Sequence, residues 1–173
     1  MTVPGDGQGS EKADDMSDEH ALFTILMVDD DPDDRLLFKE ACEEVRLRNP
    51  LHFLENGEQL VDYLKRRGPY EKHKDEPYPG IILLDLNMPL KDGREALEEV
   101  KADPELRHIP VIVLTTSKSE DDILSSYGLG ASSYIVKPIS LDRLMRVVNS
   151  IGEYWVQIVE VPDKDRQPEE PID

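Results

Sequence analysis

Five side chains that could act together follow four short apolar segments, each at the point where a segment ends. If the segments are parallel strands, their carboxyl ends lie at one edge of the sheet, where ligands of such sheets bind. We therefore expect the five side chains to converge, although each alone is commonly a helix cap, a strand residue or a solvated lysine. They are Asp29 and Asp30 after 23–28, Asp85 after 81–84, Thr115 after 111–114, and Lys137 after 133–136.

These residue types favour phosphoryl chemistry. Two like charges ~4 Å apart repel by ~4 kcal/mol at an effective dielectric of ~20, so three clustered carboxylates hold protons or need a cation. An all-oxygen site with open positions suits Mg²⁺, which shares its ligand shell with phosphate oxygens. Lys137 would add a positive charge and Thr115 a hydroxyl donor. Asp85 is the only acid on its strand, so we interpret it as a nucleophile that forms an acyl phosphate.

The segments between these residues predict the helices that position them. Asp31 and Pro32 are suited to the N-cap and first position of a helix. A short strand at 51–54 completes the set of five strands, and Ser140 is a fair N-cap for a last helix that continues towards Ile158. Strands that alternate with helices predict one doubly wound α/β sheet with helices on both faces. The expected inward positions are Phe38, Ala41, Cys42 and Val45; Leu60, Val61 and Leu64; Ala96, Leu97 and Val100; and Leu141, Leu144, Val148, Ile151, Trp155 and Ile158.

Three segments fall outside this repeat. Residues 1–21 lack periodicity and are expected to form a disordered acidic tail before a folded domain at 22–152. Residues 153–173 would be an aromatic extension followed by a second acidic disordered tail. The stretch 66–79 is longer than a usual helix-to-strand connection, and we interpret it as either a solvated insertion or a partner-binding loop.

Composition excludes several classes of function. The net charge is −18, from 20 basic and 38 acidic residues, which disfavours binding to nucleic-acid backbones. This charge indicates either simple solubility or a salt-tolerant source. The single cysteine, Cys42, permits no internal disulfide and is expected to be a core residue. No segment has the length of a membrane span or the pattern of a signal peptide, so we expect a cytoplasmic protein.

At these residues the chain resembles the CheY-like receiver domain of two-component response regulators. The resemblance covers about residues 24–151 and includes Asp85-Leu-Asn-Met-Pro89 with Asp92-Gly93, Val113-Leu-Thr115-Thr116 and Tyr134-Ile-Val-Lys137-Pro138. It implies a flavodoxin-like, CheY-like fold with five helices and five parallel strands. The implied strand order is 2-1-3-4-5, which is the known order of CheY.

The resemblance also implies a role for each site residue. Asp85 would accept a phosphoryl group from a kinase phosphohistidine. Lys137 would pair with the phosphoryl oxygens, and Thr115 would turn towards them and free space for Tyr134 to move inward. Asn87 and Thr116 would line the phosphoryl pocket, the Lys137–Pro138 bond would be cis, and Asn87 and Ser117 would tune the lifetime of the phosphorylated state. The implied Mg²⁺ ligands are Asp29, Asp30, Asp85 and the backbone carbonyl of Asn87, with Asp29 acting through water.

A narrower resemblance concerns stand-alone regulators paired with bacterial phytochrome histidine kinases. It rests on 83–95, on 110–117, on the long loop before the third predicted strand and on Tyr154-Trp155. The narrower resemblance implies a sensor histidine kinase of the phytochrome type as the partner.

The sequence is compatible with three functions. The first is a single-domain response regulator that signals through a phosphorylation-induced surface change and has no separate substrate. The second is a receiver-like adaptor that works without phosphorylation, which the intact set of five residues disfavours. The third is a small Mg²⁺-dependent phosphatase, which lacks the expected second acid because position 87 is Asn.

The last predicted helix carries apolar residues on more than one face. Its second set includes Met145, Val147, Tyr154 and Val156. A helix that is apolar on two sides is buried twice. We therefore expect a homodimer through the fourth and fifth helices, with Tyr154 and Trp155 at the interface, or a C-terminal segment that folds back on its own domain.

Overall fold

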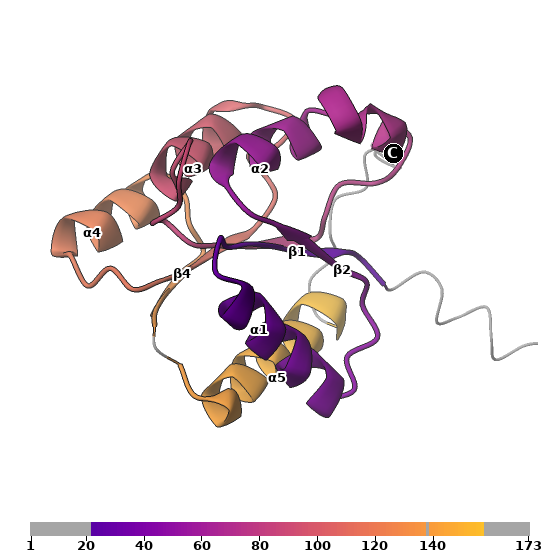
Figure 1. The fold of residues 1–173 in the computed structure, drawn as a ribbon, viewed down its shortest axis with the longest axis vertical. Helices are drawn as coiled ribbons and strands as arrows, with labels where there is room; N and C mark the ends of the chain where they lie inside the picture. Colours follow the sequence, from indigo (N-terminus) through magenta and orange to yellow (C-terminus); the bar gives the residue numbers. More distant parts are fainter. Residues whose placement is uncertain (1–21, 138, 158–173) are drawn as a thin grey trace, which may run out of the picture.

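The fold is a five-stranded parallel sheet with helices on both faces (Figure 1). The structure is a computed structural model that describes residues 22–137 and 139–157. Along the chain the elements are β1 (Ile25–Val28), α1 (Pro32–Glu44), β2 (Leu51–Leu54), α2 (Gly57–Leu64), the 3₁₀ helix η1 (Gly68–His73), β3 (Ile81–Leu84), α3 (Gly93–Ala102), β4 (Val111–Thr115), α4 (Glu120–Gly128), β5 (Ser133–Val136) and α5 (Leu141–Gln157).

The strand order is β2-β1-β3-β4-β5, which confirms the predicted topology. Every neighbouring pair is parallel, with β1 and β3 in register from Ile25 opposite Ile81 to Val28 opposite Leu84. All four residues of β1 and of β3 are buried, because helices cover both faces of the central strands. The order reverses between β1 and β3, and this is the crevice in which ligands of open α/β sheets bind.

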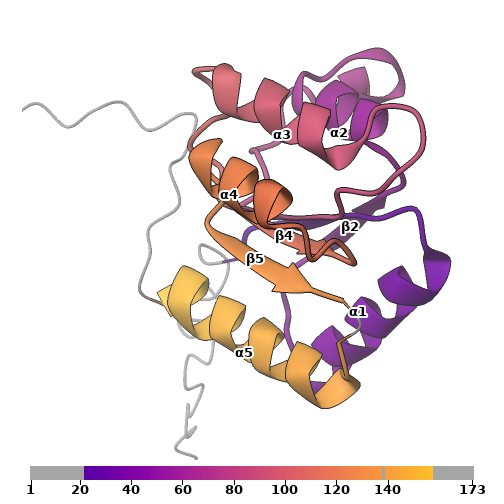
Figure 2. The same cartoon turned by 90° about the vertical axis from the view of Figure 1, so that its left-hand side faces the viewer.

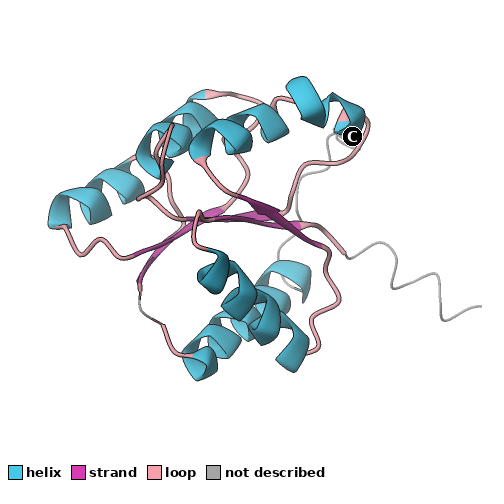
Figure 3. Cartoon of the chain, viewed as in Figure 1, coloured by secondary structure: helices cyan, strands magenta, loops and turns pink. Residues whose placement is uncertain are grey.

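The two layers of helices enclose two separate apolar cores. Helices α2, α3 and α4 lie on one side of the sheet, and α1 and α5 pack together on the other (Figure 3). One core joins Leu60 of α2 and Leu97 of α3 to alternate strand residues such as Val28. The other joins Phe38 of α1 and Val148 of α5 to the strand residues that point the opposite way. The predicted doubly wound arrangement is confirmed.

Four helices begin close to the carboxyl edge of the sheet, each with a side chain that caps its N-terminus. Asp31 caps α1 by accepting a hydrogen bond from the Asp33 N–H at 2.9 Å, and Pro32 occupies the first helical position as predicted. Asn56 caps α2, Asp92 caps α3 and Ser119 caps α4 in the same way. These caps set where each helix begins, and therefore how the loops carrying the polar residues leave the strands.

Several predicted boundaries differ from the structure. β1 begins at Ile25, two residues later than predicted, and β4 extends one residue further and includes Thr115. The stretch 66–79 is not all loop, because it contains η1, and Arg66 donates hydrogen bonds at 3.1 Å to the carbonyls of Glu76 and Pro77. The residue preferences of this stretch do not predict η1, because the contacts from Arg66 that close the loop around it join residues ten and eleven positions apart.

The predicted helix faces are largely confirmed. Phe38, Ala41 and Cys42 of α1 are buried, and burial raises the pKa of the Cys42 thiol to about 12, as expected of a core residue. The buried residues of α2, α3 and α5 include the predicted Leu60, Val61, Leu64, Ala96, Leu97, Val100, Leu144, Val148 and Ile151. The predicted tails, residue Ile158 and the predicted cis partner Pro138 lie outside the described residues.

Gly93 generates a prediction about stability, because α3 begins against the end of β3. A Cβ at this position would collide with the Asp85 carbonyl oxygen and lie 2.7 Å from the Leu86 Cα. Both contacts are to backbone, which cannot move aside cheaply. We expect Gly93→Ala to lower the free energy of unfolding by about 1–3 kcal/mol, as overpacking does. Urea denaturation measures this change.

Gly128 is the matched control. It lies at the end of α4, and nothing is within 4 Å of a Cβ placed there. Gly128→Ala should therefore be neutral or stabilise the protein by up to about 1 kcal/mol. Equal unfolding free energies for the two alanine variants would contradict the close packing of α3 on β3.

Candidate functional site

Side chains that directly follow β1, β3 and β5 meet at the carboxyl edge of the sheet, around the ammonium group of Lys137. Its Nζ donates to the Asp29 Oδ2 at 2.5 Å and to the Asp85 Oδ2 at 3.3 Å. A third bond at 2.7 Å reaches the Asp34 Oδ2 in the first turn of α1. These contacts join Lys137 to residues 108, 52 and 103 positions away, so the strand order and the packing of α1 together create this cluster.

Three carboxylates of this cluster could hold a metal ion. One oxygen each from Asp29, Asp30 and Asp85 lies within 4.8 Å of the others. Asp29 and Asp85 are buried, and Asp30 is exposed. Hard carboxylate oxygens with one solvent-facing member fit a cation such as Mg²⁺ or Mn²⁺, which retains open positions for water and phosphate.

Burial and pairing act against each other at these charges. Burial raises the pKa of Asp29 to about 6, although hydrogen bonds from Lys137 and from the Asp31 N–H oppose the rise. Burial alone would lower the pKa of Lys137, but the hydrogen bonds to Asp29 and Asp34 outweigh it and raise that pKa above its ordinary value. Lys137 therefore remains a cation, and the edge holds a fixed positive charge among its acids.

Asn87 and two threonines line the other side of Asp85. The Asn87 N–H donates to the Asp85 Oδ1 at 3.1 Å. Its side-chain Nδ2 donates to the hydroxyls of Thr115 at 3.4 Å and Thr116 at 3.3 Å. Thr115 is fully buried, and Thr116 is exposed. The Asn87 N–H therefore lies beside Asp85, the predicted nucleophile, and its NH₂ group lies beside the two hydroxyls.

Tyr134 lies further along this side of the sheet. Its ring is half-buried against the core formed with α2 and α3, and its hydroxyl donates to the Ser117 carbonyl at 3.0 Å. Tyr134 thus contacts the loop that follows Thr115. Pro138 lies outside the described residues. Tyr154 and Trp155 lie in α5, but their side chains are outside the part of the structure that is described.

The structure adds site residues that sequence reasoning missed. Asp34 shares Lys137 with Asp29, and Arg35 donates to the Asp29 carbonyl at 2.6 Å. An acid in the first turn of a helix that begins at the carboxyl edge was the available signal for Asp34. Arg94 and Asp122 form a bidentate ion pair next to Asn87, for which the sequence offers no local signal.

Comparison with known proteins identifies the family to which this geometry belongs. Residues 25–149 match the model of the response regulator receiver domain. The chain belongs to this family. The predicted family and its fold are therefore confirmed, and the cluster around Lys137 is the acidic edge of a receiver domain.

The relatives of this receiver domain include phytochrome response regulators. Response regulator Rcp1 from Synechocystis sp. is 40% identical over 148 residues, which cover 85% of this chain and 99% of Rcp1. The Mn²⁺-bound crystal structure of Rcp1 covers 81% of this chain and 99% of its own, with a TM-score of 0.71. The phosphorylated cyanobacterial phytochrome response regulator RcpA is 39% identical, covers 82% and 99%, and has a TM-score of 0.73.

These findings confirm the narrower resemblance as well. The receiver domain is related to phytochrome response regulators, two of which have structures with a divalent metal or in a phosphorylated form. Within the part of the chain that the structure describes, no helix has the length and apolar character needed to cross a bilayer.

The raised pKa of Asp29 predicts pH-dependent metal binding. A divalent cation competes with the proton of this carboxyl group, whose pKa is about 6. Above this pH the carboxylate is free, so Mn²⁺ affinity should level off. Below it the proton is held, and affinity should fall by up to about tenfold per pH unit. Calorimetric titration with Mn²⁺ at several pH values, with circular dichroism to verify folding, measures the profile.

Two variants test the assignment to Asp29. Asp29→Asn should bind Mn²⁺ more weakly and with a flatter pH profile near pH 6, whereas the exposed Asp75→Asn should match the parent protein. An unchanged profile in Asp29→Asn would show that another group controls the competition.

Proposed function

We propose that this receiver domain accepts a phosphoryl group on Asp85 from a phosphohistidine of a sensor histidine kinase. The observation that carries the proposal is the Lys137 ammonium, which lies between Asp29 and Asp85 beside three carboxylates within 4.8 Å. Buried carboxylates need a compensating positive charge, and Lys137 provides it here. The same ammonium group would pair with the oxygens of a phosphoryl group on Asp85.

The transfer needs few groups from the protein. A carboxylate oxygen of Asp85 forms a bond to phosphorus while the bond from phosphorus to the histidine nitrogen breaks, and the imidazole leaves with the electron pair. Lys137 already contacts the Asp85 Oδ2, so its charge is in place for the phosphoryl oxygens. On the other side, the Asn87 N–H and side-chain NH₂ are donors. The Thr115 and Thr116 hydroxyls, which accept from that NH₂, would be able to donate to the phosphoryl oxygens. The protein is thus an acceptor that later loses its phosphoryl group, with no separate substrate to turn over.

Mg²⁺ is the metal that we propose for this site. Its ligands would be Asp29, Asp30 and Asp85, the backbone carbonyl of Asn87 and water, with Asp29 acting through water. The ion would supply positive charge that offsets the repulsion between the carboxylates and the incoming phosphoryl oxygens.

The proposed output is a shift between two states of the surface beside β5. Thr115 would turn towards the phosphoryl group, and Tyr134 would respond through the Ser117 carbonyl that its hydroxyl already contacts. The shift can be no larger than the difference in interaction free energy that the phosphoryl group makes with the two states. The relation to phytochrome response regulators supports a phytochrome-type kinase and hence a cytoplasmic location.

Phosphorylation of Asp85 is directly testable. The protein incubated with acetyl phosphate and Mg²⁺ should gain the mass of one phosphoryl group, and Asp85→Asn should gain none because its amide is a far weaker nucleophile. Intact-mass spectrometry at neutral pH measures both. Asp75→Asn, an exposed acid remote from the edge, is the matched control and should be labelled as the parent is. Labelling that persists in Asp85→Asn would remove Asp85 from this role.

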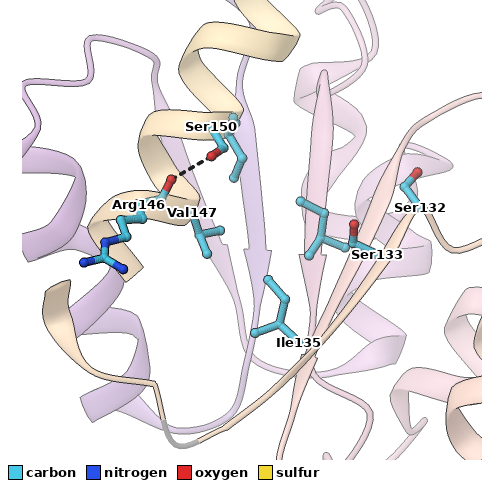
Figure 4. Close-up of a pocket in the computed structure, with 8 residues that line it drawn as sticks. Ser132, Ser133, Ile135, Arg146, Val147 and Ser150 are labelled. Atoms are coloured by element: carbon cyan, nitrogen blue, oxygen red, sulfur yellow. Dashed lines mark hydrogen bonds between the residues drawn. The ribbon is translucent and has the colours of Figure 1, made fainter. Parts of the chain in front are cut away.

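We also propose that a second copy of the chain covers the face formed by α4, β5 and α5. These three elements lie side by side in Figure 2. Leu124 and Tyr127 of α4 are 70% and 48% exposed. A hollow of about 510 Å³ opens between β5 and α5 and is lined by Ile135, Val147, Ile151 and Arg146, among others (Figure 4). Exposed apolar side chains next to an apolar hollow are typical of an interaction surface. Tyr154 and Trp155 would extend the same interface.

Light scattering tests the dimer. The parent protein should show the mass of two chains at high concentration, and Leu124→Asp should return it to one because a charge would be buried at the interface. Leu36→Asp, at an exposed leucine of α1, is the control and should leave the mass unchanged. A single-chain mass for the parent protein, with and without beryllofluoride, would end the dimer proposal.

A further inference from the structure

Arg94 connects the phosphoryl edge to the first turn of α4. It is the second residue of α3, and its guanidinium forms a bidentate pair with Asp122. The Nε donates to the Asp122 Oδ1 at 2.6 Å, and the Nη2 donates to the Asp122 Oδ2 at 2.6 Å. The same Nη2 also donates to the Asn87 Oδ1 at 3.4 Å. One side chain therefore joins two helix starts and the loop after Asp85.

The Arg94–Asp122 pair is well held on both sides. Asp122 also accepts a 2.5 Å hydrogen bond from the Ser117 hydroxyl, and Asp92 lies 3.5 Å from Arg94. The hydrogen bonds from Arg94 and Ser117 lower the pKa of Asp122 to about 2. The pair stays ionised throughout the neutral pH range, and a planar guanidinium paired at two points has a defined direction.

This direction decides how the Asn87 amide lies. An asparagine presents an oxygen acceptor on one side and an NH₂ donor on the other, and its partners determine which side faces where. A guanidinium has only donors, so the Asn87 oxygen must face Arg94. The Nδ2 then faces the Thr115 and Thr116 hydroxyls, on the side where the phosphoryl oxygens would be. The opposite orientation would aim an oxygen at those oxygens and repel them.

We propose that Arg94, held by Asp122, is a positioning residue that fixes the Asn87 amide with its NH₂ group towards the phosphoryl group on Asp85. This inference rests on the proposed phosphorylation of Asp85 and goes beyond it, because it assigns a role to an ion pair that contacts neither the phosphoryl group nor the metal ligand oxygens. Without Arg94 the amide is free to turn, and the donor is lost for part of the time.

Beryllofluoride, which occupies the place of a phosphoryl group on a carboxylate, is the probe. In Mg²⁺-containing buffer, Arg94→Met should weaken beryllofluoride binding about three- to tenfold, the effect of losing up to one hydrogen bond. Asp122→Asn should weaken binding in the same direction, because Arg94 is then less firmly held. Lys91→Met is the matched control, since it removes a 2.6 Å ion pair with Glu99 close by that does not contact Asn87. It should leave the affinity unchanged.

A double-mutant cycle separates positioning from a general structural effect. In an Asn87→Ala background there is no amide to orient, so Arg94→Met should cause no further loss of affinity. Thermal unfolding of each variant verifies that the fold persists. If Arg94→Met costs the same in both backgrounds, Arg94 acts independently of Asn87 and the inference is wrong. If the parent protein binds no beryllofluoride, or Asp85→Asn binds it equally well, the proposed function fails and the inference fails with it.

Discussion

The buried ammonium group of Lys137 compensates the negative charge of the acidic edge, and the folded arrangement of that edge depends on it. Asp29 and Asp85 are almost fully buried, and carboxylates a few ångströms apart repel by several kcal/mol even at an effective dielectric of ~20. Lys137 contacts both of them and also Asp34, so a single positive charge directly after β5 compensates the acids that follow β1 and β3 and one acid in α1. A change in charge at this edge alters the ion pairs of all of these acids together, because they share one counter-ion.

This shared charge is well suited to a switch. A divalent cation and the proposed phosphoryl group would bring opposite charges to the same place, so each would change the set of contacts that Lys137 and the acids can make. The donors around Asp85 come from separate loops, after β3 and after β4, and the Tyr134 hydroxyl contacts the second of these loops. Hydrogen bonds and the 116–117 backbone thus connect Asp85 to Tyr134 of β5.

The Arg94–Asp122 pair shows how polar residues outside the acidic cluster can shape it. Its guanidinium contacts the side-chain amide of Asn87, while Asp122 contacts the loop after β4 through Ser117. Asn87 in turn contacts Thr115 and Thr116. One hydrogen-bond network therefore joins the loop after β3 to the end of β4 and the loop that follows it. Such a network limits the conformations available to the site before any phosphoryl group arrives.

The sequence alone determined the sheet, the Asp31 cap of α1 and the polar edge. Apolar runs, Asp31–Pro32 and the alternation of strands and helices are local patterns, and parallel strands place their carboxyl ends together, so Asp29, Asp85, Thr115 and Lys137 could be predicted to converge. Only the tertiary structure decided which charges pair. Asp34 shares Lys137 because α1 packs at a particular angle, and Arg94 meets Asp122 because α3 and α4 begin side by side. Ion pairs between distant residues leave no periodic signal in a sequence, since their partners are chosen by the packing of whole helices.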